Sequence, residues 1–239
     1  MGYYEEARDA FRRGDTDVVE RLSRQELDRA RASADVAAEV EALCMLARVA
    51  LRGDDAREAV RLAAEARALA RGTGERRLER VPIHVLAASA RITGDLAAAR
   101  SLYGESIALN ESLGESRMVV AEQHNLGYVE LRAGDADRAR ELFTAARRQT
   151  LRHGHDDLIP CVAVDAAVIA AADGDHRRAA RLLAAADSAL RELQQVLDPD
   201  DAIEQEALRD RLAGALGRRS FDAAYREGAG LDLRQALSR

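Results

Sequence analysis

The feature that most constrains the fold is a repeat of 40 residues that runs through most of the chain. Two columns of small or apolar residues recur at this spacing, and a Gly-Asp dipeptide punctuates each unit. A stack of similar helical units produces this regularity, whereas a single sheet or a compact catalytic fold does not require it. The first column holds Val19, Ala59, Ala99, Ala139 and Ala179, the second holds Leu22, Leu62, Leu102, Leu142 and Leu182, and the dipeptides begin at Gly14, Gly53, Gly94, Gly134 and Gly174.

Each unit reads as two amphipathic helices joined by a turn. Apolar residues recur at spacings of three and four on both sides of the Gly134-Asp135 turn, which is the helical period. We expect Gly134 to end the first helix with a positive φ and Asp135 to cap the second. A further glycine column at Gly74, Gly114 and Gly154 closes the second helix of three units. The pattern therefore predicts an all-α protein of about five hairpins.

The residues of the fourth unit resemble the tetratricopeptide repeat. The string Leu126-Gly127, Gly134-Asp135, Ala139, Phe143 and Ala146 carries the large-small, Gly, Ala, aromatic and Ala positions of that signature. The chain departs from the family in its 40-residue period, against 34, and in lacking the closing Pro. The resemblance implies a right-handed α-solenoid whose helices are about one turn longer than usual.

The last third of the chain resembles the closing segment of actinobacterial STAND-type and LuxR-type transcriptional regulators. That resemblance implies a repeat array over residues 1–198, closed by capping helices of the same domain over 199–239, and a role in transcription regulation. The chain contains no Lys, so it has no GxxxxGK[ST] phosphate loop for the ATPase of those regulators. Both a stand-alone array and a piece of a longer regulator fit. The resembling stretches are 176–186, 215–217, 221–228 and 231–237.

The charge and composition of the chain limit where the protein can act and what it can bind. The net charge of −6 disfavours a whole-surface nucleic-acid binder, which needs a basic face. The amino terminus has no basic region followed by an apolar one, and the apolar stretches are too short to span a bilayer. Cys44 and Cys161 lie about three repeats apart, beyond disulfide reach. We therefore expect a cytoplasmic protein that binds neither DNA nor a membrane.

The family resemblance also implies a ligand groove on the concave face, lined by the first helices of the hairpins. Carried over from Leu126-Gly127, the groove positions hold six arginines, two histidines and two tyrosines. Guanidinium groups bind carboxylate or phosphate in a bidentate manner, so we expect an anionic ligand or an acidic partner. The fifth unit offers only apolar residues at these positions, including Val164 and Val168. The predicted groove residues are Tyr4, Arg8, Arg12, Arg48, Arg52, His84, Arg91, His124, Tyr128 and Arg132.

Simpler explanations compete at several of these positions. Arg12, Arg52 and Arg132 fall in the last turns of their helices, where a cation complements the helix dipole without any ligand. Cys44, His84 and His124 share one column, but equivalent side chains one helix layer apart are roughly 10 Å distant and hardly converge on one metal ion. The turn 153–157 holds two histidines and two aspartates, yet adjacent loop residues rarely complete a ligand shell. We predict no metal and no cofactor.

The sequence favours a non-catalytic scaffold or sensor that binds a peptide, a protein segment or an anionic signal. Two other interpretations remain open. Alanine-rich flanks could pair two copies into a homodimer, and groove carboxylates with His84 and His124 could serve an accessory enzyme of a biosynthetic pathway. No nucleophile or cofactor motif accompanies the buried-looking Asp165, so we do not expect an enzyme.

Overall fold

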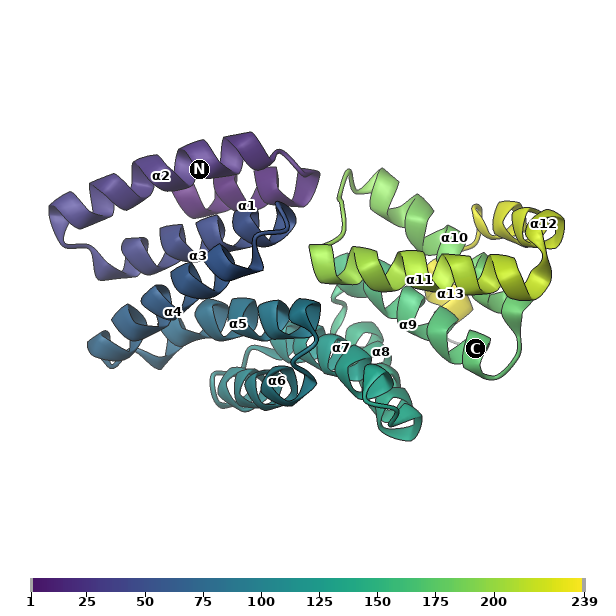
Figure 1. The fold of residues 1–239 in the computed structure, drawn as a ribbon. Helices are drawn as coiled ribbons and strands as arrows, with labels where there is room; N and C mark the ends of the chain where they lie inside the picture. Colours follow the sequence, from purple (N-terminus) through teal and green to yellow (C-terminus); the bar gives the residue numbers. More distant parts are fainter. Residues whose placement is uncertain (1, 238–239) are drawn as a thin grey trace. The chain divides into compact units, whose positions relative to one another are not determined.

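The structure is a computed structural model that describes residues 2–237, and this part of the chain is helical without a strand (Figure 1). The helices follow one another as antiparallel hairpins, as the 40-residue repeat predicts. The predicted fold class, an all-α solenoid of helical hairpins, is confirmed. The α-helices are α1 Tyr3–Arg13, α2 Thr16–Ser33, α3 Val36–Arg52, α4 Ala56–Thr73, α5 Arg80–Thr93, α6 Leu96–Ser112, α7 Ser116–Arg132, α8 Ala136–His153, α9 Ile159–Ala172, α10 His176–Glu192, α11 Pro199–Leu216, α12 Arg218–Gly228 and α13 Leu233–Leu237, with 3-10 helices η1 Arg76–Glu79 and η2 Asp156–Leu158.

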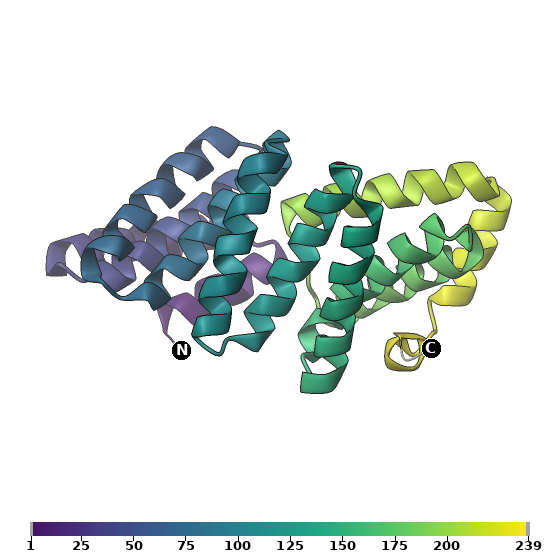
Figure 2. The same cartoon turned by 90° about the horizontal axis from the view of Figure 1, so that it is seen from below.

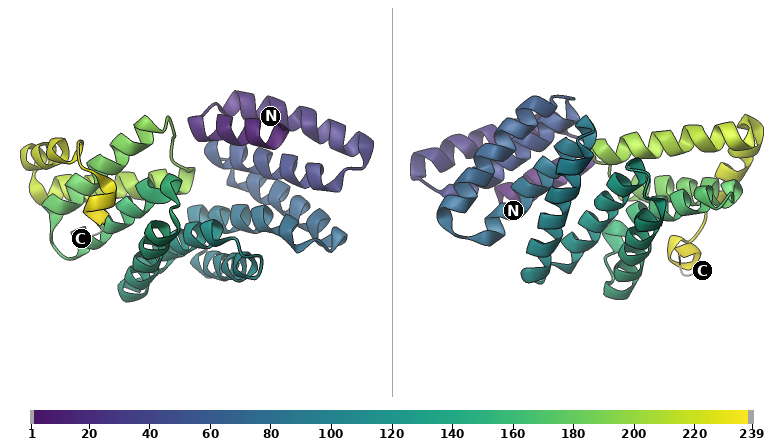
Figure 3. Two further views of the ribbon diagram at one scale, coloured as in Figure 1. Left: turned by 180° about the vertical axis from the view of Figure 1, so that it is seen from behind. Right: turned by 60° about the horizontal axis from the view of Figure 1, so that its bottom comes forward.

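The chain divides into two compact units. The first contains Met1–Ser116 together with the short segment Val196–Pro199, and the second contains Arg117–Gln195 and Asp200–Arg239. Hairpins α1–α2, α3–α4 and α5–α6 lie side by side in chain order in the first unit (Figure 3). The second unit holds hairpins α7–α8 and α9–α10 and the three closing helices. The expected division into an array over 1–198 and a cap over 199–239 stays a prediction.

From Gly14 to Gln194 a residue with positive φ follows a helix at ten positions, spaced twenty residues apart. Seven of the ten are glycines, and the other three are Ala34, Asp54 and Gln194, with φ of 54°, 61° and 52°. In the second hairpin the sequence shift places Gly53 one residue early, so Gly53 has φ of −85° and Asp54 takes the left-handed conformation. The turn position, rather than the glycine, is therefore what the fold repeats.

Aspartates begin the second helices as predicted. The Asp135 side chain accepts a hydrogen bond from the backbone N–H of Arg138 at 3.0 Å, and Gly134 before it has φ of 88°. Asp55, Asp95 and Asp175 cap α4, α6 and α10 in the same way. These caps satisfy helix N–H groups that have no intrahelical partner.

The repeat columns form the seams between helices. All five members of the first column, from Val19 to Ala179, are at most 1% exposed. The residues four positions later are buried to the same extent; they are Ser23, Ala63, Tyr103, Phe143 and Leu183. At Gly127 on α7 a Cβ atom would overlap the ring of Phe143 on α8. The large-small pair of the signature thus lets an aromatic ring approach the helix backbone.

Three helices, α11, α12 and α13, complete the second unit. Figure 2 shows α11 running beside the α9–α10 hairpin, and Leu208 and Leu212 of α11 belong to the same buried cluster as Val164 and Val168 of α9. At Gly228, the last residue of α12, a Cβ atom would overlap the backbone of Arg181 on α10. The apolar first-helix face of the fifth hairpin is therefore covered by the chain itself.

Candidate binding surface

The predicted groove residues all lie on first helices, but the structure brings only some of them together. In the first unit Tyr4, Arg8 and Arg12 lie on α1, Arg48 and Arg52 on α3, and His84 and Arg91 on α5; in the second unit His124, Tyr128 and Arg132 lie on α7. The clearest convergence joins α1 to α3.

Two arginines of α3 stack on one aromatic ring of α1. The guanidinium carbon of Arg48 lies 4.2 Å from the centroid of the Phe11 ring, and that of Arg52 lies 3.8 Å from it. Arg52 also donates a hydrogen bond of 2.7 Å to the main-chain carbonyl of Phe11. We call Phe11, Arg48 and Arg52 the carboxylate box. Phe11 is 1% exposed, so the ring provides a fixed floor for two cations, an arrangement that favours an anion above them.

A short stretch of the same chain occupies the carboxylate box. We call Val196–Pro199, between α10 and α11, the return segment, since it belongs to the first unit although its neighbours on both sides belong to the second. The Asp198 carboxylate accepts a hydrogen bond from Arg48 at 3.3 Å and lies 3.6 Å from Arg52 Nη2. Predicted anion-binding arginines thus do bind a carboxylate, one that the chain supplies.

Residues of α1 and α3 also form hydrogen bonds with the main chain of the return segment. The Val196 N–H donates a hydrogen bond of 2.8 Å to the carbonyl of Arg12, at the end of α1. The Leu197 carbonyl accepts a hydrogen bond of 3.3 Å from Arg52 Nη2. Three successive residues therefore contribute an N–H, a carbonyl and a carboxylate, which is the way a receptor holds an extended peptide.

In the second unit, His124 lies between two carboxylates. Its Nδ1 is 2.8 Å from Asp165 of α9 and its Nε2 is 3.2 Å from Asp201 of α11. His124 is 6% exposed and Asp165 1%, and the imidazole meets the ring of Tyr128 edge-on at 5.2 Å. Burial opposes charging the imidazole, but the two carboxylates outweigh it and hold the pKa of His124 well above its usual value. We call His124, Asp165 and Asp201 the histidine clamp.

Helix α11 contributes further contacts to the second unit. Glu204 forms an ion pair of 2.7 Å with Arg132 of α7. Asp187 of α10 accepts hydrogen bonds from Gln205 at 2.9 Å and Arg209 at 2.7 Å. Asp198, Asp201 and Glu204, three residues apart in the sequence, thus each meet basic residues of the predicted groove.

Several predicted residues do not present a free surface. Arg91 is 0% exposed and Tyr128 2%, so neither offers its polar group to a ligand from solution, and both pack inside their units. Val164 and Val168, expected to form an apolar end of the groove, are each 5% exposed beneath α11. The physical reason is that an apolar helix face is stable only when something covers it, and α11 does so here.

The acidic residues that pair with the predicted groove cations are not among the residues predicted from the sequence. Asp198, Asp201 and Glu204 appear in the sequence as part of an acidic run around Pro199. Asp165, in the middle of an apolar helix, was the one recognisable signal for a buried ion pair. Its partner is His124, 41 residues earlier and so almost one repeat away.

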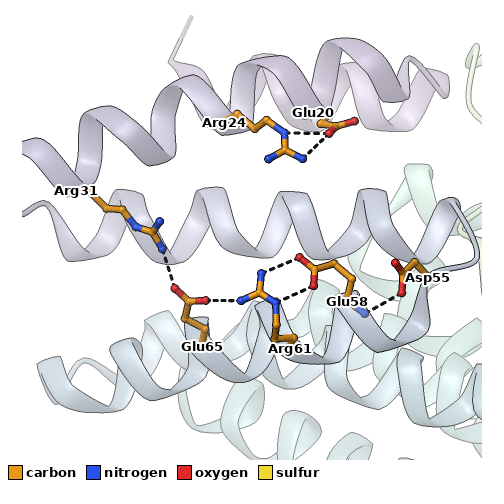
Figure 4. A network of polar contacts seen from close by, with 7 residues as sticks. All are labelled: Glu20, Arg24, Arg31, Asp55, Glu58, Arg61 and Glu65. Atoms are coloured by element: carbon orange, nitrogen blue, oxygen red, sulfur yellow. Dashed lines mark hydrogen bonds and ion pairs between the residues drawn. The ribbon is translucent and has the colours of Figure 1, made fainter.

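A second concave feature of the first unit holds cations that are already neutralised. A trough of about 660 Å³ runs between α2 and α4 over α3, with an apolar floor that includes Leu43 and Leu46. Figure 4 shows Arg24 paired with Glu20, and Arg31 joined through Glu65 to Arg61 and Glu58. These exposed pairs balance in charge, so the trough has no net attraction for an anion.

Within the described residues 2–237, no group of three or more His, Cys, Asp or Glu side chains is arranged to hold a metal ion. No helix in this part of the chain combines the length and the hydropathy that a membrane span requires. Cys44 and Cys161 do not form a disulfide. Burial raises the pKa of the Cys44 thiol above its usual value, which makes it unreactive.

Comparison with known proteins identifies the fold and no closer family. No model of a known protein family matches the chain, and no curated protein matches its sequence. The crystal structure of BtubC (BKLC) from P. vanneervenii superposes with a TM-score of 0.62 at 20% identity, over 93% of this chain and 92% of that one. A Rap protein in complex with Competence and Sporulation Factor gives a TM-score of 0.65 at 14% identity, over 99% and 75%.

At these identities the likeness concerns the fold alone. The class that the fold defines is an all-α protein built of repeated helical hairpins.

Proposed function

We propose that the protein is a non-catalytic scaffold that binds an acidic segment of a partner protein or peptide through the basic first-helix face of its first unit. The observation that carries this proposal is the carboxylate box. Two guanidinium groups stacked on Phe11 hold a carboxylate and a neighbouring carbonyl of an extended segment. The Rap protein, which shares the fold, was crystallised with a bound factor, and this supports a binding role.

The surroundings of His124 and Asp165, the two groups best suited to acid-base chemistry, support a non-catalytic role. His124 and Asp165 are within hydrogen-bond distance of each other, but both are buried and α11 supplies a second carboxylate to the imidazole. A general base must reach the proton of a substrate, and here both ring nitrogens of His124 already face carboxylates. The histidine clamp is thus better suited to holding α11 than to catalysis.

The resemblance of the closing segment to actinobacterial STAND-type and LuxR-type regulators supports a narrower role. We propose that the scaffold acts in the cytoplasm in transcription regulation, by binding a regulatory partner rather than DNA. The net charge of −6 agrees with a protein partner.

The proposal is tested by screening displayed peptides against the full chain. The baits are the parent, an Arg48→Glu/Arg52→Glu variant and an Arg24→Glu control, which changes an exposed α2 arginine outside the box. We expect parent-bound peptides to be enriched in an Asp or Glu beside apolar residues, to be lost with the double variant and to be kept by the control. Equal binding by all three baits, or no selected peptide, would overturn the proposal.

A further inference from the structure

We infer that the return segment is a built-in competitor for the carboxylate box, and that the external ligand is an extended peptide segment with an apolar residue followed by an acidic one. This inference rests on the proposed function, because it names the ligand class and the group that the ligand must displace. The inference is based on what the return segment brings to the box: a main-chain N–H and a main-chain carbonyl, which every peptide has, and one side-chain carboxylate.

The contacts of the return segment define what a displacing segment must offer. The Val196 N–H and the Leu197 carbonyl are main-chain groups, so their partners accept any sequence. The carboxylate of Asp198 is the only charged group that the segment brings to Arg48 and Arg52. Pro199 restricts Asp198 to extended backbone, which fixes the carboxylate next to the bonded carbonyl. The box therefore selects an extended chain that carries an acidic side chain.

The ion pair between Asp198 and the two arginines is open to water, so another carboxylate can replace it. The side chain of Asp198 is 37% exposed, while those of Arg48 and Arg52 are 20% and 16% exposed. Ion pairs with one partner this open to water contribute little to stability. Val196 is 48% exposed although it is apolar, so the segment buries little surface of its own. A peptide with the same groups and a better-buried apolar side chain would therefore compete with it.

When a tethered competitor occupies a site, the apparent affinity for an outside ligand is the intrinsic affinity multiplied by the fraction of time that the site is free. Removing the carboxylate of the return segment should raise that affinity while leaving the box intact. Asp198→Asn suits this purpose, since Asn keeps the size of the side chain and serves equally well in front of a helix. The matched control is Asp210→Asn, which removes the same charge from an exposed position on α11.

The probe is a fluorescein-labelled, amidated peptide with the sequence Gln-Val-Leu-Asp-Pro-Asp-Asp, which is that of residues 195–201. Its binding to the full-length chain is followed by fluorescence anisotropy. We expect Asp198→Asn to bind the probe about two- to fivefold tighter than the parent or Asp210→Asn, because an exposed ion pair holds the competing segment only weakly. Adding Arg52→Met to Asp198→Asn should abolish the gain, because it removes the cation that meets both the carboxylate and the carbonyl.

Hydrogen exchange of the Val196 amide provides a second readout that requires no ligand. The amide should be protected in the parent, where it donates to the Arg12 carbonyl, and exchange faster in Asp198→Asn. An unprotected amide in the parent would overturn the inference. So would equal, Arg52-dependent binding of the probe to parent and Asp198→Asn, which would leave the proposed function standing. A protected amide with no probe binding to any variant would overturn both proposals.

Discussion

The carboxylate box of the first unit and the histidine clamp of the second use the same chemistry in different surroundings. In both, a cation on a first helix meets an aspartate from the neighbourhood of Pro199. Asp198 in the box is 37% exposed at its side chain, whereas Asp165 in the clamp is 1% exposed. Burial rather than charge separates a contact that can be exchanged from one on which the unit depends.

The largest effect should come from breaking the clamp. Asp165→Asn removes the more deeply buried of the two carboxylates that face His124. Breaking a buried ion pair typically costs about 3–5 kcal/mol, and Asp201 still partners the imidazole, so the cost should lie at the lower end of that range. We expect the free energy of unfolding, measured by urea denaturation followed by circular dichroism, to fall by about 3 kcal/mol. Asp210→Asn serves as the control. A loss below about 1 kcal/mol would mean that the clamp does not stabilise the second unit.

A somewhat smaller effect should follow from crowding the aromatic residues beside the clamp. In Gly127→Ala the new Cβ would overlap the Phe143 ring, which stacks edge-on against Tyr128 at 5.0 Å, and Tyr128 in turn contacts His124. Overpacking of this kind costs about 1–3 kcal/mol. We expect a loss of about 2 kcal/mol in the same denaturation experiment.

The matched control for crowding is Gly104→Ala on α6. Nothing lies within 4 Å of the Cβ that it introduces, so it should stabilise the helix by about 0.5–1 kcal/mol. If both variants changed stability alike, the tight approach of α7 and α8 would play no part in holding the rings.

The pH dependence of stability should distinguish the clamp from every contact of the box. The folded pKa of His124 lies above its unfolded value, so its contribution is complete below about pH 6.5 and is lost as pH rises through the folded pKa. Over that interval a single proton changes the free energy of unfolding by about 1.4 kcal/mol per pH unit. We expect the parent to lose stability at about this slope relative to His124→Gln between pH 7 and pH 8. Parallel curves for the two proteins would show that the imidazole is not held charged.

The sequence could predict the parts of the fold that repeat. The columns of Ala59 and Leu62, and the Gly134-Asp135 turns, recur every 40 residues because each hairpin solves the same packing problem, and the hairpins appear where the columns place them. The left-handed Asp54 could not be predicted from residue type, because Gly53 satisfies the dipeptide pattern one position away.

Only the arginines of the candidate site could be predicted from the sequence, for a related reason. Arg48 and Arg52 follow from repeat register, so their place on a first helix could be assigned. Their partner Asp198 lies outside the repeat, some 150 residues away, and no periodicity relates it to them. Contacts between the repeat and the segment after it depend on the three-dimensional path of the chain, which sequence periodicity does not encode.

The smallest effect should come from the box itself. Asp198→Asn removes a carboxylate from two arginines that keep their contacts with the Phe11 ring and, for Arg52, with the Phe11 carbonyl. Water reaches the carboxylate, so its loss should cost no more than about 0.5–1 kcal/mol in urea denaturation. A cost as large as that of Asp165→Asn would make the return segment a fixed part of the first unit, and a segment so firmly bound could not give way to an external peptide. A small cost, together with tighter binding of the probe, would instead place the two aspartates in the separate roles that their burial indicates.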